Sequence, residues 1–231
     1  MKVLVVGATG GTGMAVIRAL LARGCVVTAF ARQPQALQGL PGKLSLIAGD
    51  ALHQPDIDDA VRGHDAVVVT LGIRENALRV RLLGSAGTAM EVRSRGTQHV
   101  VAAMQRHGVR RLVVQSSYGV GSTRDRLPWL YRMVFALLLK PQIADTERQE
   151  SIVRGSGLDW VLAQPVNLTD ENTHEPAMAS ARGDFLSMKI SRTQVADFLA
   201  DAALSVQHSG HAVALSAPAA RSAQRANPAA R

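Results

Sequence analysis

The chain has 231 residues, of which 47% are hydrophobic; this suits the core of one ordinary α/β domain, although the length alone permits two small ones. Only 3% are aromatic, which argues against a stacking platform for single-stranded nucleic acid. The single cysteine, Cys25, fits a reduced compartment and cannot form an internal disulfide or a thiolate metal cage. The formal charge of +8 comes from basic residues spread along the chain, so we expect a basic surface that can attract an anionic ligand rather than a nucleic-acid-binding protein.

Short apolar runs alternate with longer amphipathic segments from the N-terminus onwards. The runs expected to form strands are KVLVV (2–6), VVTAFA (26–31), LSLIA (44–48), AVVVTLG (66–72), RLVVQSS (111–117), DWVLAQP (159–165) and HAVALS (211–216). The segments expected to form helices lie near 11–23, 55–62, 96–107, 128–155 and 192–206. This alternation indicates βαβ units, whose right-handed crossovers place helices on both faces of a parallel sheet. We therefore predict an α/β, Rossmann-type, doubly wound and mostly parallel sheet, in a single domain over residues 1–216.

Two polar stretches interrupt the alternation, at residues 73–95 and 169–183. Both follow strands that should end at the carboxyl edge of the sheet, where open α/β sheets bind ligands, so we predict that they are substrate loops. Residues 217–231 are rich in Ala, Pro and Arg without periodicity and are expected to be a disordered tail. Neither a secretion-signal pattern nor an apolar run of roughly 18 residues is present, which predicts a cytoplasmic protein without a membrane partner.

The motif GATGGTG, at residues 7–13, stands where the first strand gives way to the first helix. A dinucleotide pyrophosphate needs a tight turn, close approach of the backbone, and a helix N-terminus whose free N–H groups face the anion. Glycine lacks the Cβ atom that would obstruct each of these. The spacing differs from the G-x-G-x-x-G of many dehydrogenases, but the strand before it and the helix after it are the context that supports nucleotide binding.

The residues after the second and third strands indicate which dinucleotide is bound. An NAD-selective protein usually carries an acidic residue after the second strand, for the ribose 2′-hydroxyl, whereas this chain carries Arg32. A guanidinium pairs with a 2′-phosphate, so we predict that NADP(H) is preferred over NAD(H). After the third strand, Asp50 is placed to accept from the adenine amino group and the Ala51 backbone to complete that edge, although Asp is also common in turns.

Several motifs, taken together, resemble the atypical short-chain dehydrogenase/reductases. They are GATGGTG, Arg32, GD at 49–50, VVTLG at 68–72, GVRRLVVQSS at 108–117, SGLDWVLAQP at 156–165 and ISRTQVADFL at 190–199. The similarity is to their single-domain NAD(P)H-binding group, which includes flavin and biliverdin-IXβ reductases and nitrogen-metabolite-repressor-like redox sensors, and it covers roughly residues 1–215. The resemblance implies a cofactor site made of Gly7, Thr9, Gly10, Gly11, Thr12, Gly13, Arg32, Asp50, Ala51, Leu71, Gly72, Ser116, Pro165 and Val166. By the same resemblance Ser116 lies beside the nicotinamide, and the backbone around Pro165 and Val166 faces its carboxamide.

The chain departs from the family where protein side chains perform chemistry. The usual tyrosine four residues before a lysine is absent, because Ser122 follows Tyr118 and Phe135 follows Tyr131 at that spacing. The family's common Arg-Pro after the sixth strand is Gln164-Pro165 here. No cluster of Cys, His and Asp has metal-ligand spacing, so no metal is predicted.

These departures favour chemistry that needs little from a protein acid: hydride transfer from NADPH to a flavin, quinone or tetrapyrrole, an acceptor that can be anionic. Ser116, Ser117 and Tyr118 are the predicted catalytic residues, placed to hydrogen-bond or pack beside the acceptor. The pair of serines is equally compatible with a purely structural role at a strand end. Two other functions stay open, namely a non-catalytic NADP(H)-binding redox sensor that acts through a protein partner and a sugar-nucleotide epimerase-like enzyme.

Overall fold

The computed structural model describes residues 1–73, 88–127, 140–173 and 175–219, and the account below is confined to them. Its strands are β1 (Lys2–Val6), β2 (Val26–Ala31), β3 (Leu44–Ala48), β4 (Ala66–Val69), β5 (Arg111–Gln115), β6 (Asp159–Pro165), β7 (Asn167–Thr169), β8 (Met178–Ser180), β9 (Lys189–Ser191) and β10 (His211–Ser216). Its α-helices are α1 (Gly11–Ala22), α2 (Gln54–Val61), α4 (Val92–His107), α6 (Lys140–Arg154) and α7 (Arg192–Leu204), with 3₁₀ turns at Pro34–Leu37 and Gly121–Arg126.

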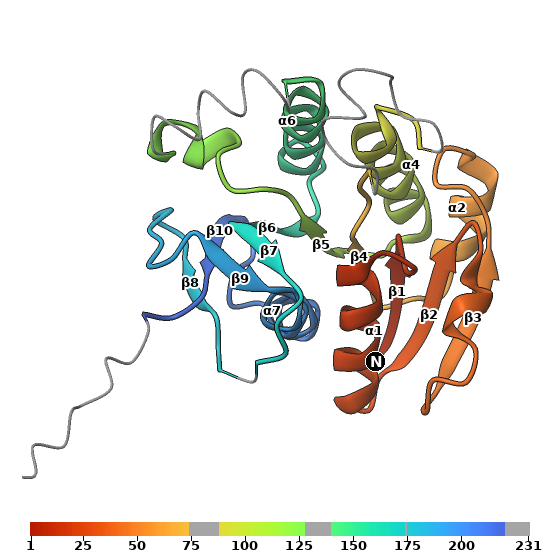
Figure 1. Cartoon of the computed structure of the whole chain (residues 1–231). Helices are drawn as coiled ribbons and strands as arrows, with labels where there is room; N and C mark the ends of the chain where they lie inside the picture. The colour runs from red at the N-terminus through yellow and green to blue at the C-terminus, as the bar shows by residue number, and fades with distance from the viewer. Residues whose placement is uncertain (74–87, 128–139, 174, 220–231) are drawn as a thin grey trace, which may run out of the picture.

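Eight strands form the main sheet in the order β3-β2-β1-β4-β5-β6-β10-β8, and β7 pairs with β9 in a small second sheet (Figure 1). The pairs from β3 to β10 are parallel, and β8 alone joins the main sheet in the antiparallel direction. The strand order reverses between β1 and β4, which is the point where such sheets bind ligands. The predicted fold class is confirmed.

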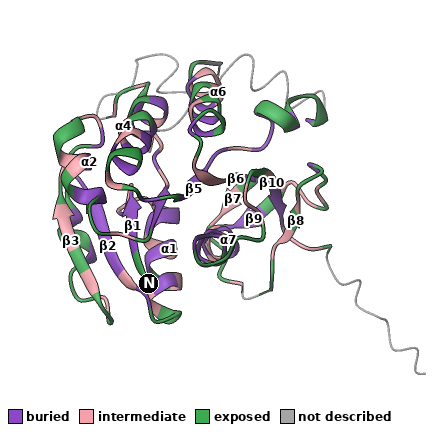
Figure 2. Cartoon of the chain, turned by 180° about the vertical axis from the view of Figure 1, so that it is seen from behind, coloured by how far each residue is buried: buried purple, intermediate pink, exposed green. Residues whose placement is uncertain are grey.

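Helices cover both faces of the sheet, because successive strand residues point to opposite sides. On β1, Val3 and Val5 pack in the core cluster that α1 and α7 cover, whereas Leu4 and Val6 pack in the cluster that α2, α4 and α6 cover. The central strands are therefore buried on both faces (Figure 2).

Several predicted boundaries move, and two have identifiable causes. Helix α4 begins at Val92, inside the stretch that we predicted as a loop to residue 95, because the Asp145 carboxylate of α6 accepts from the N–H groups of Arg93 and Ser94 and so caps it. Helix α7 ends at Leu204 rather than near 206, because Ser205 is extended. Short β8 lies within the other predicted substrate loop.

Four predicted segments fall partly outside the described residues. They are 74–87 of the first predicted substrate loop, residue 174 of the second, 128–139 of the helical stretch predicted at 128–155, and 220–231 of the predicted tail. No helix in the part of the chain that is described combines the length and the apolar character needed to cross a bilayer.

Candidate functional site

The turn between β1 and α1 depends on Gly7, which has a φ of +87°. A Cβ there would lie 2.8 Å from the carbonyl oxygen of Thr70, at the end of the neighbouring β4. The backbone N–H groups of Gly7 and Ala8 both donate to the carbonyl oxygen of Phe30, which ties the turn to β2. Only glycine at residue 7 combines this conformation with this close approach.

The N-terminus of α1 is built to face an anion. Gly10 is the N-cap and has no side chain to cap the helix, and the first turn holds no acidic residue. The N–H groups of Gly11, Thr12 and Gly13 make no hydrogen bond to the described backbone outside the helix. Gly13 brings the helix close to the turn, since a Cβ there would lie only 2.4 Å from the carbonyl oxygen of Gly7. Free donors and the positive end of the helix dipole therefore meet at one point, which fits a dinucleotide pyrophosphate.

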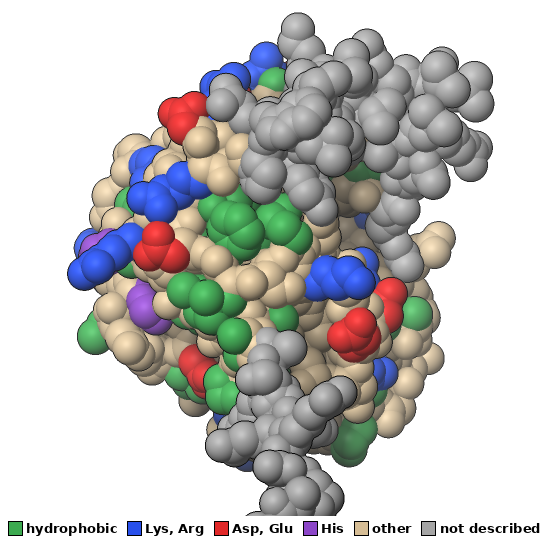
Figure 3. Space-filling view, turned by 60° about the vertical axis from the view of Figure 1, so that its left-hand side comes forward, with side chains coloured by type: hydrophobic (Ala, Val, Ile, Leu, Met, Phe, Trp, Pro, Cys, Tyr) green, Lys and Arg blue, Asp and Glu red, His purple; other side chains and the backbone are tan. Residues whose placement is uncertain are grey.

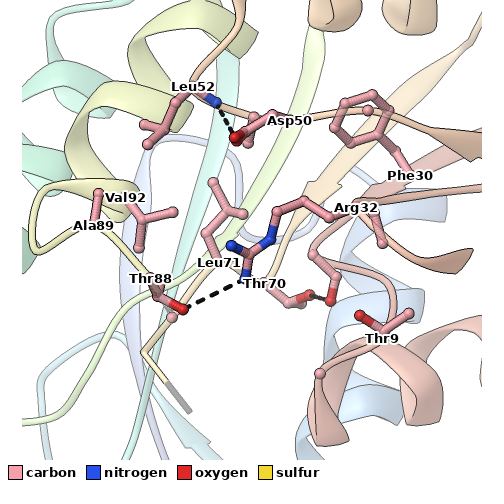
Figure 4. Close-up of a pocket in the computed structure, with 16 residues that line it drawn as sticks. Thr9, Phe30, Arg32, Asp50, Leu52, Thr70, Leu71, Thr88, Ala89 and Val92 are labelled. Atoms are coloured by element: carbon pink, nitrogen blue, oxygen red, sulfur yellow. Dashed lines mark hydrogen bonds between the residues drawn. The ribbon is translucent and has the colours of Figure 1, made fainter. Parts of the chain in front are cut away.

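A cavity of about 340 Å³ opens beside this helix end, at the carboxyl edge of β1, β2, β3 and β4 (Figure 4). The predicted cofactor-binding residues that line it are Gly7, Thr9, Gly10, Arg32, Asp50, Ala51, Leu71 and Gly72. The lining residues that sequence reasoning missed are Phe30, Ala31, Gly49, Leu52, Thr70, Thr88, Ala89 and Val92. Thr88 and Ala89 belong to the stretch predicted as a substrate loop, so part of that stretch joins the wall of this cavity.

Arg32 follows β2 and extends across the cavity toward Thr88 (Figure 4), with 3.5 Å between its Nη2 atom and the Thr88 hydroxyl oxygen. Among the 16 described residues that line the cavity, Asp50 is the only acidic one, and it stands after β3 rather than after β2. Arg32 therefore stands at the position where an NAD-selective protein usually carries an acidic residue that binds the ribose. A carboxylate there would repel a 2′-phosphate.

Asp50 also shapes the turn in which it lies. Its Oδ1 atom accepts from the N–H of Leu52 at 2.9 Å, and its own N–H donates to Oδ2 of Asp56 at 2.9 Å. That backbone hydrogen bond, together with the hydrogen bond from His53, lowers the pKa of Asp56. The turn is thus fixed, which leaves the Oδ2 atom of Asp50 without a partner among the described residues and available to a ligand.

Helix α4 closes one side of the cavity through a glycine that sequence reasoning missed. A Cβ at Gly96 would lie 2.5 Å from the Cδ1 atom of Leu71 and 3.3 Å from the Cβ of Ala51, so the helix approaches both lining residues as closely as it can. His99, one turn later, contacts the Ala51 carbonyl oxygen through Nδ1 at 3.0 Å. The only signal in the sequence was an isolated glycine inside an amphipathic helix.

A second polar cluster lies where β5 and β6 end. The carboxylate of Glu150, on α6, is buried and receives three donors. Its Oε1 atom accepts from the Ser116 hydroxyl at 2.5 Å and from Nε2 of Gln164 at 2.7 Å, and its Oε2 atom accepts from Nη2 of Arg154 at 3.2 Å. Arg154 follows Glu150 by four residues on the same helix, whereas Ser116 and Gln164 come from the ends of β5 and β6, which no local spacing relates to Glu150.

The other predicted catalytic residues have different partners. The Ser117 hydroxyl lies 3.4 Å from the carbonyl oxygen of Tyr118, a weak contact. The Tyr118 hydroxyl donates to the carbonyl oxygen of Gly183 at 3.0 Å, its ring meets that of Phe185 edge to face, and burial raises the pKa of its phenol. Tyr118 therefore links the end of β5 to the predicted substrate loop.

Six predicted cofactor-binding residues lie outside the cavity lining. They are Gly11, Thr12, Gly13, Ser116, Pro165 and Val166. The first three form the start of α1, Ser116 follows β5, Pro165 is the last residue of β6 and Val166 comes directly after it. The Pro165 carbonyl accepts from Tyr118 N–H at 2.9 Å and the Val166 N–H donates to Leu215 at 3.0 Å, so these two backbone groups are already engaged.

The glycine turn, the uncapped helix end and a cavity at the reversal of strand order define a Rossmann-type dinucleotide-binding domain. The family described as NAD(P)H-binding matches residues 7–205, and the chain belongs to this family. The predicted resemblance to atypical short-chain dehydrogenase/reductase-like proteins is confirmed by this match and by the solved structures that share the fold.

Among similar proteins, the 3-beta-hydroxysteroid dehydrogenase of Mycolicibacterium neoaurum is 35% identical over 126 residues, which cover 52% of this chain and 32% of that protein. The match thus spans about a third of that relative's length. A Rossmann-fold NAD(P)-binding family protein from Shigella flexneri is 26% identical with a TM-score of 0.69, over 94% of this chain and 93% of that one. An anaerobilin reductase from Escherichia coli O157:H7, at 19% identity, shares the fold with a TM-score of 0.72 over 94% and 98% of the two chains.

Proposed function

We propose that this protein is an NADPH-dependent oxidoreductase of the atypical short-chain type, which reduces a flat conjugated acceptor such as a flavin, a quinone or a tetrapyrrole. The observation that carries the proposal is the cavity in which the α1 N-terminus and Arg32 face one space. When bound there, NADPH supplies the hydride, and the protein supplies binding and orientation. The reductase among the solved structures of the same fold is in keeping with this class of reaction.

The preference for NADP(H) rests on Arg32. A charge-assisted hydrogen bond to a phosphate contributes about 1.5–3 kcal/mol, so losing it should weaken binding by roughly 10- to 100-fold. Arg32→Ala should therefore raise the Kd for NADPH by that factor while the Kd for NADH changes by less than about twofold. Arg18→Ala, at an exposed position on α1, is the matched control and should change neither value.

At the nicotinamide end we assign different roles to the three residues that follow β5. Ser116 is oriented by Glu150, to which its hydroxyl hydrogen is committed, so it faces the cofactor as an acceptor. The Ser117 hydroxyl makes only a long contact with the carbonyl oxygen of Tyr118, at 3.4 Å, and can exchange it for a hydrogen bond to an acceptor carbonyl. Tyr118 holds the loop that carries Gly183 and Phe185 beside them. In this arrangement the proton for the reduced acceptor comes from solvent.

A second function is favoured by the same hydrogen bonds. Because Ser116 and Tyr118 already donate to protein acceptors, the chain also suits a non-catalytic NADP(H) sensor that acts through a protein partner. Such a sensor requires a partner-binding state with unequal affinity for the two redox forms of the cofactor.

One experiment separates the two functions. Purified protein is titrated with NADPH and NADH, and oxidation is then followed at 340 nm after adding flavins, quinones and tetrapyrroles. We expect tight NADPH binding and turnover with at least one acceptor. Tight binding with no turnover would transfer the assignment to the sensor, and no dinucleotide binding would refute both.

A further inference from the structure

Arg93, the second residue of α4, lies against the wall of the cofactor cavity. Its Nη2 atom is 3.0 Å, and its Cζ atom 3.5 Å, from the point where a Cβ on Gly72 would lie. Gly72 lines the cavity just after β4, and Val92, the neighbour of Arg93, lines it too. A guanidinium can occupy this place because residue 72 has no side chain.

The guanidinium of Arg93 makes no hydrogen bond and no ion pair with any residue that the structure describes. Its nearest carboxylate, Asp145, accepts from the N–H groups of Arg93 and Ser94 and from the Ser94 hydroxyl, so that carboxylate is engaged in capping α4. Burial lowers the pKa of Arg93 and Asp145 opposes that shift, but an arginine remains charged at neutral pH. Arg93 is partly buried, and a partly buried cation without an acceptor favours an anionic ligand at this point.

The position of Arg93 indicates which anion this is. The Arg93 guanidinium lies beside Gly72 at the cavity, and the Arg93 N–H donates to Asp145 of α6. The same helix carries Glu150, which orients Ser116. Arg93 is thus in contact both with a residue that lines the cofactor cavity and with the helix that carries Glu150. The phosphates of the cofactor already have the α1 N-terminus and Arg32 as partners in the proposed function.

We propose that Arg93 binds the anionic group, a phosphate or a carboxylate, of the conjugated acceptor and thereby orients its ring toward the cofactor. This inference rests on the proposed function, since it names the residue that selects the acceptor. A fork of guanidinium donors suits either oxyanion.

The test compares FMN with riboflavin, which share one ring system and differ by a phosphate. Flavin binding is followed by fluorescence quenching with NADP⁺ present, so that no turnover is needed. The wild type should bind FMN at least about tenfold tighter than riboflavin, in line with one charge-assisted contact, and Arg93→Gln should abolish that difference. Arg93→Lys, which retains the charge, should keep part of it, and Arg95→Gln, at an exposed position on the same helix, should keep all of it.

A wild type that binds FMN no tighter than riboflavin overturns the inference, as does an Arg93→Gln variant that keeps the preference. If the Kd for NADPH rises tenfold in Arg93→Gln while FMN is still bound more tightly than riboflavin, Arg93 is assigned to the cofactor diphosphate instead. Should Arg93→Gln fail to fold, Arg93→Lys takes its place, and an undiminished FMN preference in that variant overturns the inference. The proposed function fails separately, through absence of NADPH oxidation by any acceptor, and an Arg93-dependent FMN preference would then stand without it.

Discussion

Gly13→Ala should destabilise the protein, although the same change stabilises most helices. In an ordinary helix, Ala is favoured over Gly by about 1 kcal/mol. Here the added Cβ would lie 2.4 Å from the Gly7 carbonyl oxygen and 3.0 Å from that of Ala8. Both are backbone atoms held by β1 and its turn, so the helix itself must move. Overpacking of this kind costs typically 1–3 kcal/mol, and after the gain of about 1 kcal/mol in helix preference we expect a net loss of up to about 2 kcal/mol in the free energy of unfolding.

Gly11→Ala, two residues earlier in the same helix, is the matched control. Its Cβ would meet only the side chain of Arg192, at 2.9 Å from the Cδ atom, and that side chain extends to an exposed ion pair with Asp170. Arg192 can move aside at little cost. This variant should therefore be as stable as the wild type or slightly more stable.

Urea denaturation measures the stability of both variants, and titration with NADPH measures the second consequence. A displaced α1 carries its free N–H groups away from the pyrophosphate, so the Kd of Gly13→Ala should rise by about tenfold, equivalent to one weakened contact of about 1.4 kcal/mol. Equal stability and equal Kd values for the two variants would refute the assignment of Gly13 to close packing and of the α1 end to phosphate binding.

Two further predictions concern buried polar groups. Glu150→Gln leaves an amide that cannot accept from all three donors and removes a buried charge, so it should lower the free energy of unfolding by about 2–4 kcal/mol. Glu147→Gln, on the same helix but in a surface ion pair, should cost less than about 1 kcal/mol, and equal losses would contradict the buried network. Burial lowers the pKa of His64 in the folded state, so the unfolded chain takes up a proton first as the pH falls through about 6.5, and stability declines below that value. His64→Gln should flatten the curve of unfolding free energy between about pH 7 and pH 5, and an unchanged slope would exclude this histidine as a cause.

The parallel sheet was predictable from the sequence because its strands are buried on both faces. A strand covered by helices on each side reads as a continuous apolar run, as in KVLVV and VVTAFA, and the amphipathic segments between such runs fix the crossovers. The short strands at β7, β8 and β9 were missed, because three residues are too few for any period to appear. The formation of strands as short as these depends on tertiary packing.

The cofactor half of the site was predictable for a different reason, namely that it is made largely of backbone. Gly7 and Gly13 must be glycine because carbonyl oxygens occupy the space of a side chain, and such a requirement leaves a local motif. Thr88 lines the same cavity, and Gly96 packs against the lining residues Leu71 and Ala51, through contacts that no local spacing encodes. On the face in Figure 3, basic and acidic side chains are interspersed.

The presence of Gln164 in place of the family's arginine shows why the part of the proposed site that would bind the acceptor could not be predicted from the sequence. In the family that the chain resembles, an arginine precedes Pro165, and its absence suggested only that a cation had been lost. In the structure Gln164 donates to Glu150 as a neutral group, while Arg154, one turn further along α6 and stacked over Trp160, supplies the positive charge from the solvent side. The carboxylate is thus balanced without a cation at the end of β6. In our proposal Arg93, beside Gly72 at the wall of the cavity, supplies the cation that recognises an anionic acceptor.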